Sequence, residues 1–512
     1  MKNNTTNSST SNKLIFTNTL ILYFRLIITI SIALYTSRIV LNILGVEDFG
    51  LYNVVGGMVA LFSFFSASMQ SASQRFLMFD LGQNNYLKFN KTFNANVQLY
   101  IIIGLLVFVL AETLGLWYFT NKAKIPENKL DIFLIIYHIS ICSYCFSILR
   151  IPFSSGVIAQ EKFNFYAYTS IFEAVLKLIF VSLLISTNYN KIIYYASTIL
   201  IITLIINLIY FIYCSLDKRK LYKLSLILDK ETIKPIISFS GWRMLGSTSQ
   251  MIEQNGIVLL INYFFNATAN ASYAIATQVN IAINNLVSSF QQAFYPQITK
   301  RYADNNFQEL YPLVLISGKI SFYLLAIISI PFLLNIEYIL FIWLNKVPDN
   351  SILFTLLIIA CSLIDVFSTP LWMLILSTGK IAKYQIYLSI ITLLMFLVTW
   401  VFIIYGSNPS LILIVKAISS VIILNYRYYL LKYYYKIHVK GYLINSVLKP
   451  LLLFLFVLFI IYNITLSLVG FEKLIMTLFT ELILFPISIY LLLSSSQKLF
   501  LKNLVNQKLN RN

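Results

Sequence analysis

The chain has 512 residues, of which 59% are hydrophobic and 11% are charged, and its formal net charge is +19. So low a charged fraction over this length excludes an array of soluble domains and is typical of an integral membrane protein. A strongly positive charge also fits proteins that bind nucleic acid, but here the lysines and arginines gather in loops on one side of the apolar segments. We therefore expect no nucleic-acid partner.

The polar stretch 1–13 leads into an apolar segment without a small-residue cleavage site, so we expect this first segment to be retained. Further apolar segments follow, and each reaches the roughly 20 residues that cross a bilayer as an α-helix. They predict an all-α polytopic protein with about fourteen transmembrane helices, near 14–36, 51–72, 93–118, 130–149, 165–186, 191–213, 235–262, 272–294, 310–333, 351–376, 384–405, 411–431, 447–468 and 472–493.

The second of these segments carries polar residues at helical spacing. Ser63, Ser66, Gln70 and Gln74 follow one another at steps of three, four and four, which places them on one side of a helix. A membrane helix with one apolar side and one stripe of hydroxyl and amide groups borders a partner helix or a water-filled cavity. We expect this stripe to line a cavity.

The sequence around this helix resembles a known family. The resemblance is carried by LG-x-x-DFG-x-YNVVGG at residues 44–57, by QRF at 74–76 and by LG at 81–82. It is to the polysaccharide-transporter branch of the multidrug/oligosaccharidyl-lipid/polysaccharide exporter superfamily, the bacterial flippases for lipid-linked sugar repeats. The resemblance implies a MATE-like fold in which two six-helix lobes form a V around a central cavity.

Loop charges distinguish the two sides of the membrane. Lysines and arginines concentrate in loops 215–234 and 427–449 and in the tail after Gln497, whereas loops 263–271 and 334–350 are nearly neutral. Because basic loops stay in the cytoplasm, both termini are expected there, which agrees with an even number of helices. We expect the protein in the bacterial inner membrane.

The two halves of the chain repeat the same layout. Sliding one half over the other places Asn284 on Ser63 and Gln291 on Gln70, and each half holds six predicted helices. An even number of helices per half makes the repeats parallel rather than inverted. The expected parts are a cytoplasmic tail (1–13), an N-lobe (14–215), a cytoplasmic linker (216–234), a C-lobe (235–432), an appended helix pair (433–493) and a basic cytoplasmic tail (494–512).

Ionisable residues at membrane depth are costly and are therefore functional candidates. Arg25 and Arg38 lie on the first predicted helix, and Arg243 heads a stripe with Gln250 and Gln254 on the first helix of the second half. Arginine suits phosphate because its planar group donates two parallel hydrogen bonds. The alternative is that these arginines extend to the membrane surface and bind nothing.

The remaining buried charges have two interpretations each. Glu253 and Asp365 either couple transport to an ion or proton, or form structural ion pairs, and Lys319 and Lys416 either line the second lobe or pack structurally. Glu173 and Lys177 are spaced for a local pair on one helix. The candidate cavity residues are Arg25, Arg38, Ser63, Gln70, Gln74, Arg243, Gln250, Gln254, Asn284, Gln291, Lys319 and Lys416.

Other chemistries have little support in the sequence. Cys142 and Cys145 form a C-x-x-C pair inside a predicted membrane helix, without a second pair to complete a metal site. No G-x-x-x-x-G-K-[ST] loop for nucleotide binding is present, and no long loop offers space for an enzyme site. We expect no cofactor, no metal and no catalytic residue.

The predicted function is a flippase for a lipid-pyrophosphate-linked oligosaccharide, moved by alternating access through a cationic cavity. The alternatives are a cation-coupled drug exporter of the MATE type, which calls for acidic and aromatic cavity walls, and a flippase for the peptidoglycan-precursor lipid. The expected partners are the lipid-linked oligosaccharide and membrane lipid, with a polysaccharide polymerase and a chain-length regulator as further candidates. The transport unit is expected to be a monomer.

Overall fold

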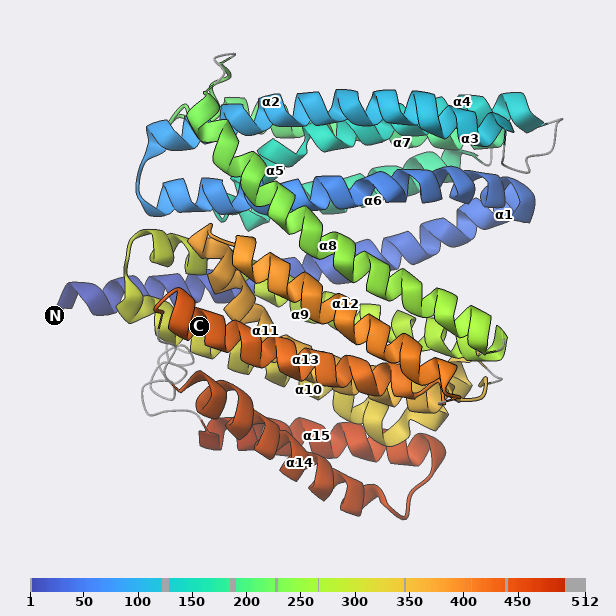
Figure 1. Ribbon diagram of the computed structural model, residues 1–512, viewed down its shortest axis with the longest axis vertical. Helices are drawn as coiled ribbons and strands as arrows, with labels where there is room; N and C mark the ends of the chain where they lie inside the picture. The colour runs from blue at the N-terminus through green and yellow to red at the C-terminus, as the bar shows by residue number, and fades with distance from the viewer. Residues whose placement is uncertain are drawn as a thin grey trace, which may run out of the picture. The chain divides into compact units, whose positions relative to one another are not determined.

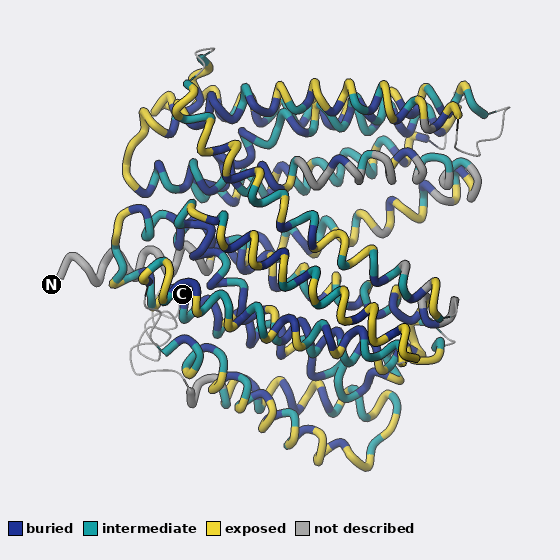
Figure 2. The backbone as a smooth tube through the Cα atoms, in the orientation of Figure 1, coloured by how far each residue is buried: buried dark blue, intermediate teal, exposed yellow. Residues whose placement is uncertain are grey.

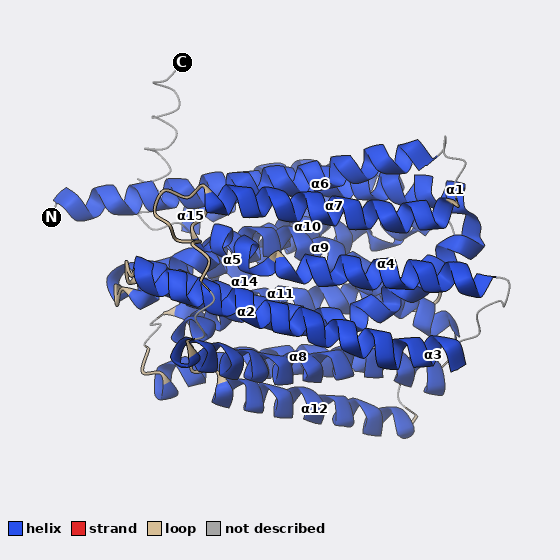
Figure 3. Ribbon diagram, turned by 90° about the horizontal axis from the view of Figure 1, so that it is seen from above, coloured by secondary structure: helices blue, strands red, loops and turns tan. Residues whose placement is uncertain are grey.

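The computed structural model describes residues 2–121, 129–184, 190–225, 229–265, 267–344, 347–406, 408–437 and 441–492. Throughout these ranges the chain forms helices joined by turns and loops, and they contain no strand (Figure 3). The all-α class predicted from the apolar segments is confirmed.

The first helix, α1 (Lys2–Gly82), covers the first two predicted spans. It is divided at Gly45, whose φ of 76° and ψ of 172° are not helical. Glycine adopts a positive φ at little cost because it lacks a Cβ. The glycine of the LG-x-x-DFG motif therefore supplies the break between spans 14–36 and 51–72.

The next predicted spans are helices as well. The helix at 93–118 is formed by α2, a π-helical turn and α3, and α4 has the predicted bounds 130–149. A short helix, α5, lies where a loop was expected. The bounds are α2 (Tyr86–Leu110), η1 (Ala111–Gly115), α3 (Leu116–Asn121), α4 (Leu130–Leu149), α5 (Ile151–Ala159), α6 (Phe163–Leu183) and α7 (Lys191–Ser215).

The second half continues in the same way. Three of its helices are several residues longer than predicted, because α8, α9 and α10 extend beyond the predicted spans. Asn335 (φ −129°) interrupts α10 just after the predicted end of its span at 333. The bounds are α8 (Lys230–Phe264), α9 (Ala267–Ala303), α10 (Phe307–Leu344), α11 (Ser351–Thr378), α12 (Ala382–Ile404), α13 (Leu411–Tyr429), η4 (Leu430–Tyr434), η5 (Leu443–Leu448), α14 (Lys449–Thr465) and α15 (Gly470–Leu492).

Ten helices in the described part of the chain are long and apolar enough to cross a membrane. The other four predicted spans also coincide with helices, namely the second part of α1, α8, α9 and α15. In α8 and α9 the average apolarity is lower because polar residues such as Arg243, Gln250 and Asn284 recur along them. The protein is a multi-span membrane protein with about the predicted number of helices.

The burial pattern of α2 is that of a helix in lipid (Figure 2). Its buried side includes Asn94 and Asn96, whereas its exposed side presents large apolar residues such as Ile102, Leu105 and Val109. A soluble helix has the opposite arrangement. Lipid solvates the apolar side, and the protein interior satisfies the amides.

The chain packs into two compact units. Unit 1 comprises residues 1–252, 288–311 and 373–390, and unit 2 comprises 253–287, 312–372 and 391–512. In unit 1, α1 packs against α2, α5 and α6, and α4 lies beside α7 (Figure 1). In unit 2, buried Ile257, Tyr273, Phe354 and Leu413 belong to one apolar core. The lobe boundaries proposed from the sequence remain a prediction.

Candidate functional site

A polar pocket of about 320 Å³ lies within unit 1. Its lining comes from α1, α4, α5, α6, α7 and the junction of α4 with α5. We call it the Arg150 pocket, and it is lined by Gln70, Ser147, Arg150, Ile151, Ser154, Tyr166, Thr169, Ser170, Glu173 and Tyr210. A pocket so rich in hydroxyl, amide and charged groups, among helices long and apolar enough to cross a membrane, is a functional candidate.

The local sequence explains why these groups converge. The polar residues of α6 share one face because they recur at i, i+3, i+4 and i+7: Tyr166, Thr169, Ser170 and Glu173. Arg150 stands where α4 ends and α5 begins. Thr169 and Tyr210 join α6 to α7 through hydroxyl groups 3.3 Å apart.

Positive charge exceeds negative charge around the Arg150 pocket. Arg150 Nη1 donates to the Glu173 carboxylate at 3.0 Å, and Lys177 interacts electrostatically with the same carboxylate. The guanidinium carbon of Arg25 lies 4.9 Å from the centroid of the Tyr166 ring. Two cationic side chains therefore interact with one carboxylate, and a third stacks on a tyrosine of the pocket lining.

Arg25 also has an unsatisfied donor. Its Nε is buried and meets no hydrogen-bond acceptor among the residues described. A buried N–H of a charged group is unfavourable unless a ligand or water accepts from it. Together with the excess of cations, this favours an anionic ligand.

A second charged cluster lies within unit 2, and we call it the Glu253 cluster. Glu253 of α8, Asp365 of α11 and Lys416 of α13 interact electrostatically with one another. Asp365 also accepts a hydrogen bond from Ser420 and interacts with Arg427 further along α13. The structure thus brings together three residues that the sequence singled out on separate helices. Here two carboxylates flank one lysine.

The other predicted cavity residues of unit 1 occupy varied positions. Gln74 is half-buried one turn beyond Gln70, Gln291 is buried on α9, and Arg38 and Gln250 are exposed. The side chain of Ser63 lies outside the described residues. The role of these residues in a cavity stays a prediction.

Arg243 is half-buried on α8 and interacts electrostatically with the buried Tyr295. One turn further on, the hydroxyl of Ser247 lies 3.0 Å from that of Ser68 on α1. The helices α1 and α8 are therefore neighbours in unit 1 at Ser68, a residue that lies outside the predicted polar stripe of α1. That Arg25 and Arg243 act on one ligand stays a prediction.

The predicted residues of unit 2 outside the Glu253 cluster have their own surroundings. Gln254 is exposed, next to Glu253 in the chain. Asn284 donates to the Asn280 carbonyl at 3.0 Å and to the Ser362 hydroxyl at 3.3 Å. Lys319 is half-buried on α10, where it interacts with Lys449 rather than with Lys416. Nowhere in the described ranges do three His, Cys, Asp or Glu side chains gather as a metal site requires.

Arg150 is not among the residues that the sequence predicted for a cavity. The spacing of Glu173 and Lys177 predicted a local pair, and the two do interact electrostatically, but the ion pair of Glu173 at 3.0 Å is with Arg150. The i,i+4 spacing could not reveal a partner from another helix. The polar spacing along α6 was the available signal.

Arg75 of the QRF motif is buried and contacts the end of another helix. It is 6% exposed and donates from Nε and Nη2 to the Ser377 carbonyl, at 3.3 and 3.0 Å. Ser377 lies in the last turn of α11, where carbonyls lack backbone partners and a cation is favourable. Gly379, with a φ of 74°, follows, and a Cβ there would stand 2.5 Å from Arg75 Nη2. The motif therefore ties α1 to the end of α11.

Solved structures with similar folds are transporters. A MATE transporter in the bent conformation has a TM-score of 0.70 at 13% identity, over 81% of this chain and 94% of that chain. An outward-facing multidrug resistance MATE family transporter of the MOP superfamily has a TM-score of 0.68 at 12% identity, over 81% and 94%. A MOP superfamily transporter from Pyrococcus furiosus, described by a reverse polarity of its binding pocket, has a TM-score of 0.66 at 13% identity, over 80% and 94%. These likenesses show a MATE-like fold, as predicted.

No curated relative matches the sequence. The family model described as polysaccharide biosynthesis protein matches residues 15–302, which is more than half of the chain and includes the whole lining of the Arg150 pocket. The family expected from the motif around α1 is thereby confirmed. The chain belongs to the polysaccharide biosynthesis protein family and is a multi-span membrane transporter with a MATE-like fold.

Proposed function

We propose that the protein is a flippase for a lipid-pyrophosphate-linked oligosaccharide, such as a repeat unit of O-antigen, capsule or a related polysaccharide. It moves this substrate across the bacterial inner membrane by alternating access. The observation that carries the proposal is the excess of cations around the Arg150 pocket. Arg25 stacks on the pocket residue Tyr166, and its buried Nε has no acceptor among the described side chains and backbone groups. The family match and the transporter fold support it.

A diphosphate suits this pocket. Arginine presents several donors in one plane, and Glu173 engages Arg150 through Nη1, which leaves other N–H groups for a ligand. A charged hydrogen bond in a partly desolvated site contributes roughly 1.5–3 kcal/mol. Tyr166, Tyr210 and Gln70 offer rings, hydroxyls and an amide to sugars. The lipid tail of the substrate would remain in the bilayer.

Arg243 serves the same substrate from α8 in this proposal. The hydrogen bond between Ser68 of α1 and Ser247 of α8 supports a shared path along these two helices. The remaining predicted positions would line that path as the substrate advances: Arg38, Gln74, Gln250, Gln254, Asn284, Gln291 and Lys319. The basic loops support cytoplasmic termini, so the substrate would arrive from that side.

The Glu253 cluster is the proposed coupling element. Protonation of Glu253 or Asp365 would remove one of the two negative charges that flank Lys416. Such a change alters the balance of charge at the meeting point of α8, α11 and α13. A proton or ion gradient could thereby bias the transporter toward one conformation.

A cation-coupled drug exporter is the rival function that has a specific observation in its favour, namely these two carboxylates. Its substrate pocket would need negative charge, whereas cations outnumber carboxylates around the Arg150 pocket. The relative from Pyrococcus furiosus, described by reverse pocket polarity, supports the idea that this fold accommodates pockets of either sign. A peptidoglycan-precursor flippase shares the phosphate chemistry and is distinguished by its substrate.

The test is deletion of the gene in its host. The deletion should cause lipid-linked repeat units to accumulate on the cytoplasmic face without changing drug sensitivity. The wild-type gene and a Lys191→Gln control, altered at an exposed residue at the start of α7, should restore export, whereas Arg150→Gln should restore only about a tenth of it. Drug sensitivity with normal export would instead identify a drug exporter, and arrested peptidoglycan synthesis would identify the other flippase.

A further inference from the structure

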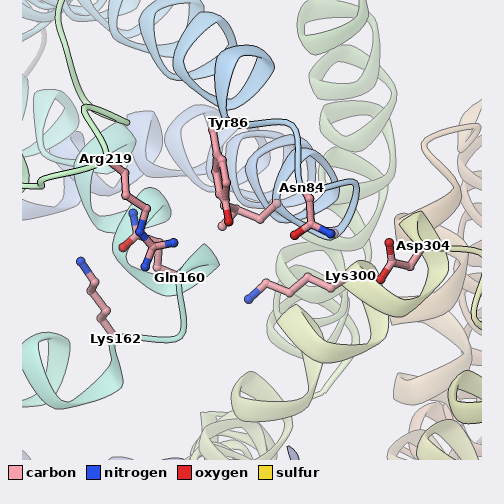
Figure 4. Close-up of a pocket in the computed structure, with 9 residues that line it drawn as sticks. Asn84, Tyr86, Gln160, Lys162, Arg219, Lys300 and Asp304 are labelled. Atoms are coloured by element: carbon pink, nitrogen blue, oxygen red, sulfur yellow. The ribbon is translucent and has the colours of Figure 1, made fainter. Parts of the chain in front are cut away.

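A second cavity of about 330 Å³ lies in unit 1, at the end of the bundle where loop 216–225 and the turn between α5 and α6 meet. Its lining includes Asn84, Tyr86, Gln160, Lys162, Arg219 and Lys300, and we call it the Lys300 pocket. Figure 4 shows Lys162 and Arg219 pointing toward each other and Lys300 reaching toward the same space. The loops here belong to the side predicted to be cytoplasmic.

The cations Lys162, Arg219 and Lys300 come from three separate elements, and they differ in whether a carboxylate lies close enough to form an ion pair. Lys162 is 3.7 Å from Asp217, and Lys300 is ion-paired with Glu161. Arg219 has no carboxylate within ion-pair distance among the described residues, and its guanidinium carbon lies 5.8 Å from the centroid of the Tyr86 ring. Asp304 is the one carboxylate in the lining itself. Arg219 therefore leaves a positive charge free for a ligand.

The loop that carries Arg219 is held in place. Asn90 donates to the carbonyls of Leu221 and Lys223 at 3.0 and 2.9 Å, and Asn94 accepts from the Ser225 N–H at 2.7 Å. Tyr222 is buried, and its hydroxyl accepts from Gln160 at 2.9 Å. These contacts position Arg219 before any ligand binds, which reduces the entropy cost of binding.

Lys300 has two roles in this region. It lines the pocket, and it also binds the Glu161 carboxylate, which is 6% exposed and accepts a further hydrogen bond from Gln297. The end of α1 also packs closely against α9, because a Cβ on Gly82 would stand 2.6 Å from the Lys300 carbonyl oxygen. Through these contacts, Glu161 links α9 to the turn that joins α5 to α6.

We propose that the Lys300 pocket binds a phosphate-bearing anion, and that the bound anion draws Lys300 away from Glu161 and loosens α9 from the α5–α6 turn. A phosphate and a carboxylate compete for the same ammonium group, and Arg219 and Lys162 favour the phosphate. This inference rests on the proposed function, since the anion that loosens α9 would be the headgroup of the transported lipid diphosphate. A free phosphate in the cytoplasm has the same chemistry, so the test separates the two sources.

The test measures the distance between α6 and the start of α10 in the full-length protein. Spin labels are placed at the exposed positions Asn164 and Gln308, after the four native cysteines are replaced by alanine and export is shown to persist. The protein is held in phosphatidylcholine nanodiscs. Inorganic pyrophosphate is titrated in one series and farnesyl diphosphate in another. Either probe should lengthen the distance, and a far lower midpoint for farnesyl diphosphate would identify a lipid headgroup as the source.

Substitutions show which pocket produces the change in the spin-label distance. Arg219→Gln should raise the midpoint about tenfold, the usual result of losing one charged contact, whereas the neighbouring Lys218→Gln should leave it unchanged. Glu161→Gln should lengthen the distance without any anion. A midpoint that responds to Arg150→Gln and not to Arg219→Gln would overturn the proposal, because the Arg150 pocket would then drive the movement. The export assay above decides the proposed function separately.

Discussion

The Arg150 pocket and the Glu253 cluster are both polar centres on helices of bilayer length, yet they differ in the balance of their charges. Around the first, Arg150 and Lys177 interact with one carboxylate, and Arg25 stacks on Tyr166. In the second, Glu253 and Asp365 share Lys416, and Asp365 also interacts with Arg427. The first centre can attract an anion, whereas the second is already compensated by its own cations. Polarity alone marks both as functional, and the balance of charge divides the work between them.

The largest expected effect is a reversal of charge in the first centre. Arg150→Glu would place a second carboxylate beside Glu173, so phosphate would meet repulsion in place of a donor, which costs several kcal/mol. Export should fall on the order of a hundredfold or more. The measurement is complementation of surface-polysaccharide export at matched membrane abundance. Lys191→Glu, at the exposed start of α7 where a carboxylate suits the helix, is the control. Equal export by both variants would remove the distinction between the centres.

In the second centre the lysine is expected to hold the carboxylates together. Lys416→Met would remove the one cation that Glu253 and Asp365 share, which should cost about 2 kcal/mol of stability. Adding Asp365→Asn should recover most of this loss, because one negative charge is then gone. Thermal unfolding in detergent measures both variants. A double variant no more stable than the single one would show that Lys416 does not compensate these carboxylates.

Substitutions of Arg243 test whether the path of the anionic substrate extends to α8. Arg243→Ala should lower export about tenfold, the result of losing one charged hydrogen bond. Arg243→Lys should restore part of it, since lysine keeps the charge but not the planar pair of donors. Export and protein abundance in the membrane are compared in the same cells. Full activity of the alanine variant would confine phosphate recognition to the Arg150 pocket.

The smallest effect is expected for Lys177, which interacts with Glu173 but does not line the pocket. Lys177→Gln should reduce export roughly two- to fivefold, as expected for the loss of a partly solvated electrostatic interaction. A loss as large as that of Arg150→Gln would mean that Lys177 itself contacts the substrate. The same complementation assay, run side by side, makes this comparison.

The helices could be predicted from the sequence because an apolar run of bilayer length permits little else. The bounds of α4 and the break at Gly45 agree with the expected spans. The short α5 was missed, since nine residues are too few to cross a bilayer and their sequence, IPFSSGVIA, reads as a continuation of the loop. Its Gly156 lies against Tyr222, a contact that no local pattern reveals.

The candidate site was only partly predictable. Gln70 was singled out by its polar stripe and Arg25 by its charge at membrane depth, and both are associated with the Arg150 pocket, Gln70 in its lining and Arg25 stacked on Tyr166. Arg150 itself and its pair with Glu173 depend on how α4, α5 and α6 pack, and sequence spacing does not report packing between helices. The same holds for Lys416, which has no partner in its own helix pattern but meets carboxylates from α8 and α11.

The most direct measurement is flipping itself. The purified protein is reconstituted in liposomes with a lipid-diphosphate-linked oligosaccharide, and the rate at which the sugar reaches the opposite leaflet is followed. Wild type and Lys218→Gln should flip at equal rates, and Arg25→Gln and Arg150→Gln should each be about tenfold slower. Equal rates for all four proteins, at equal reconstitution, would contradict the claim that the cationic pocket of unit 1 binds the substrate's phosphates.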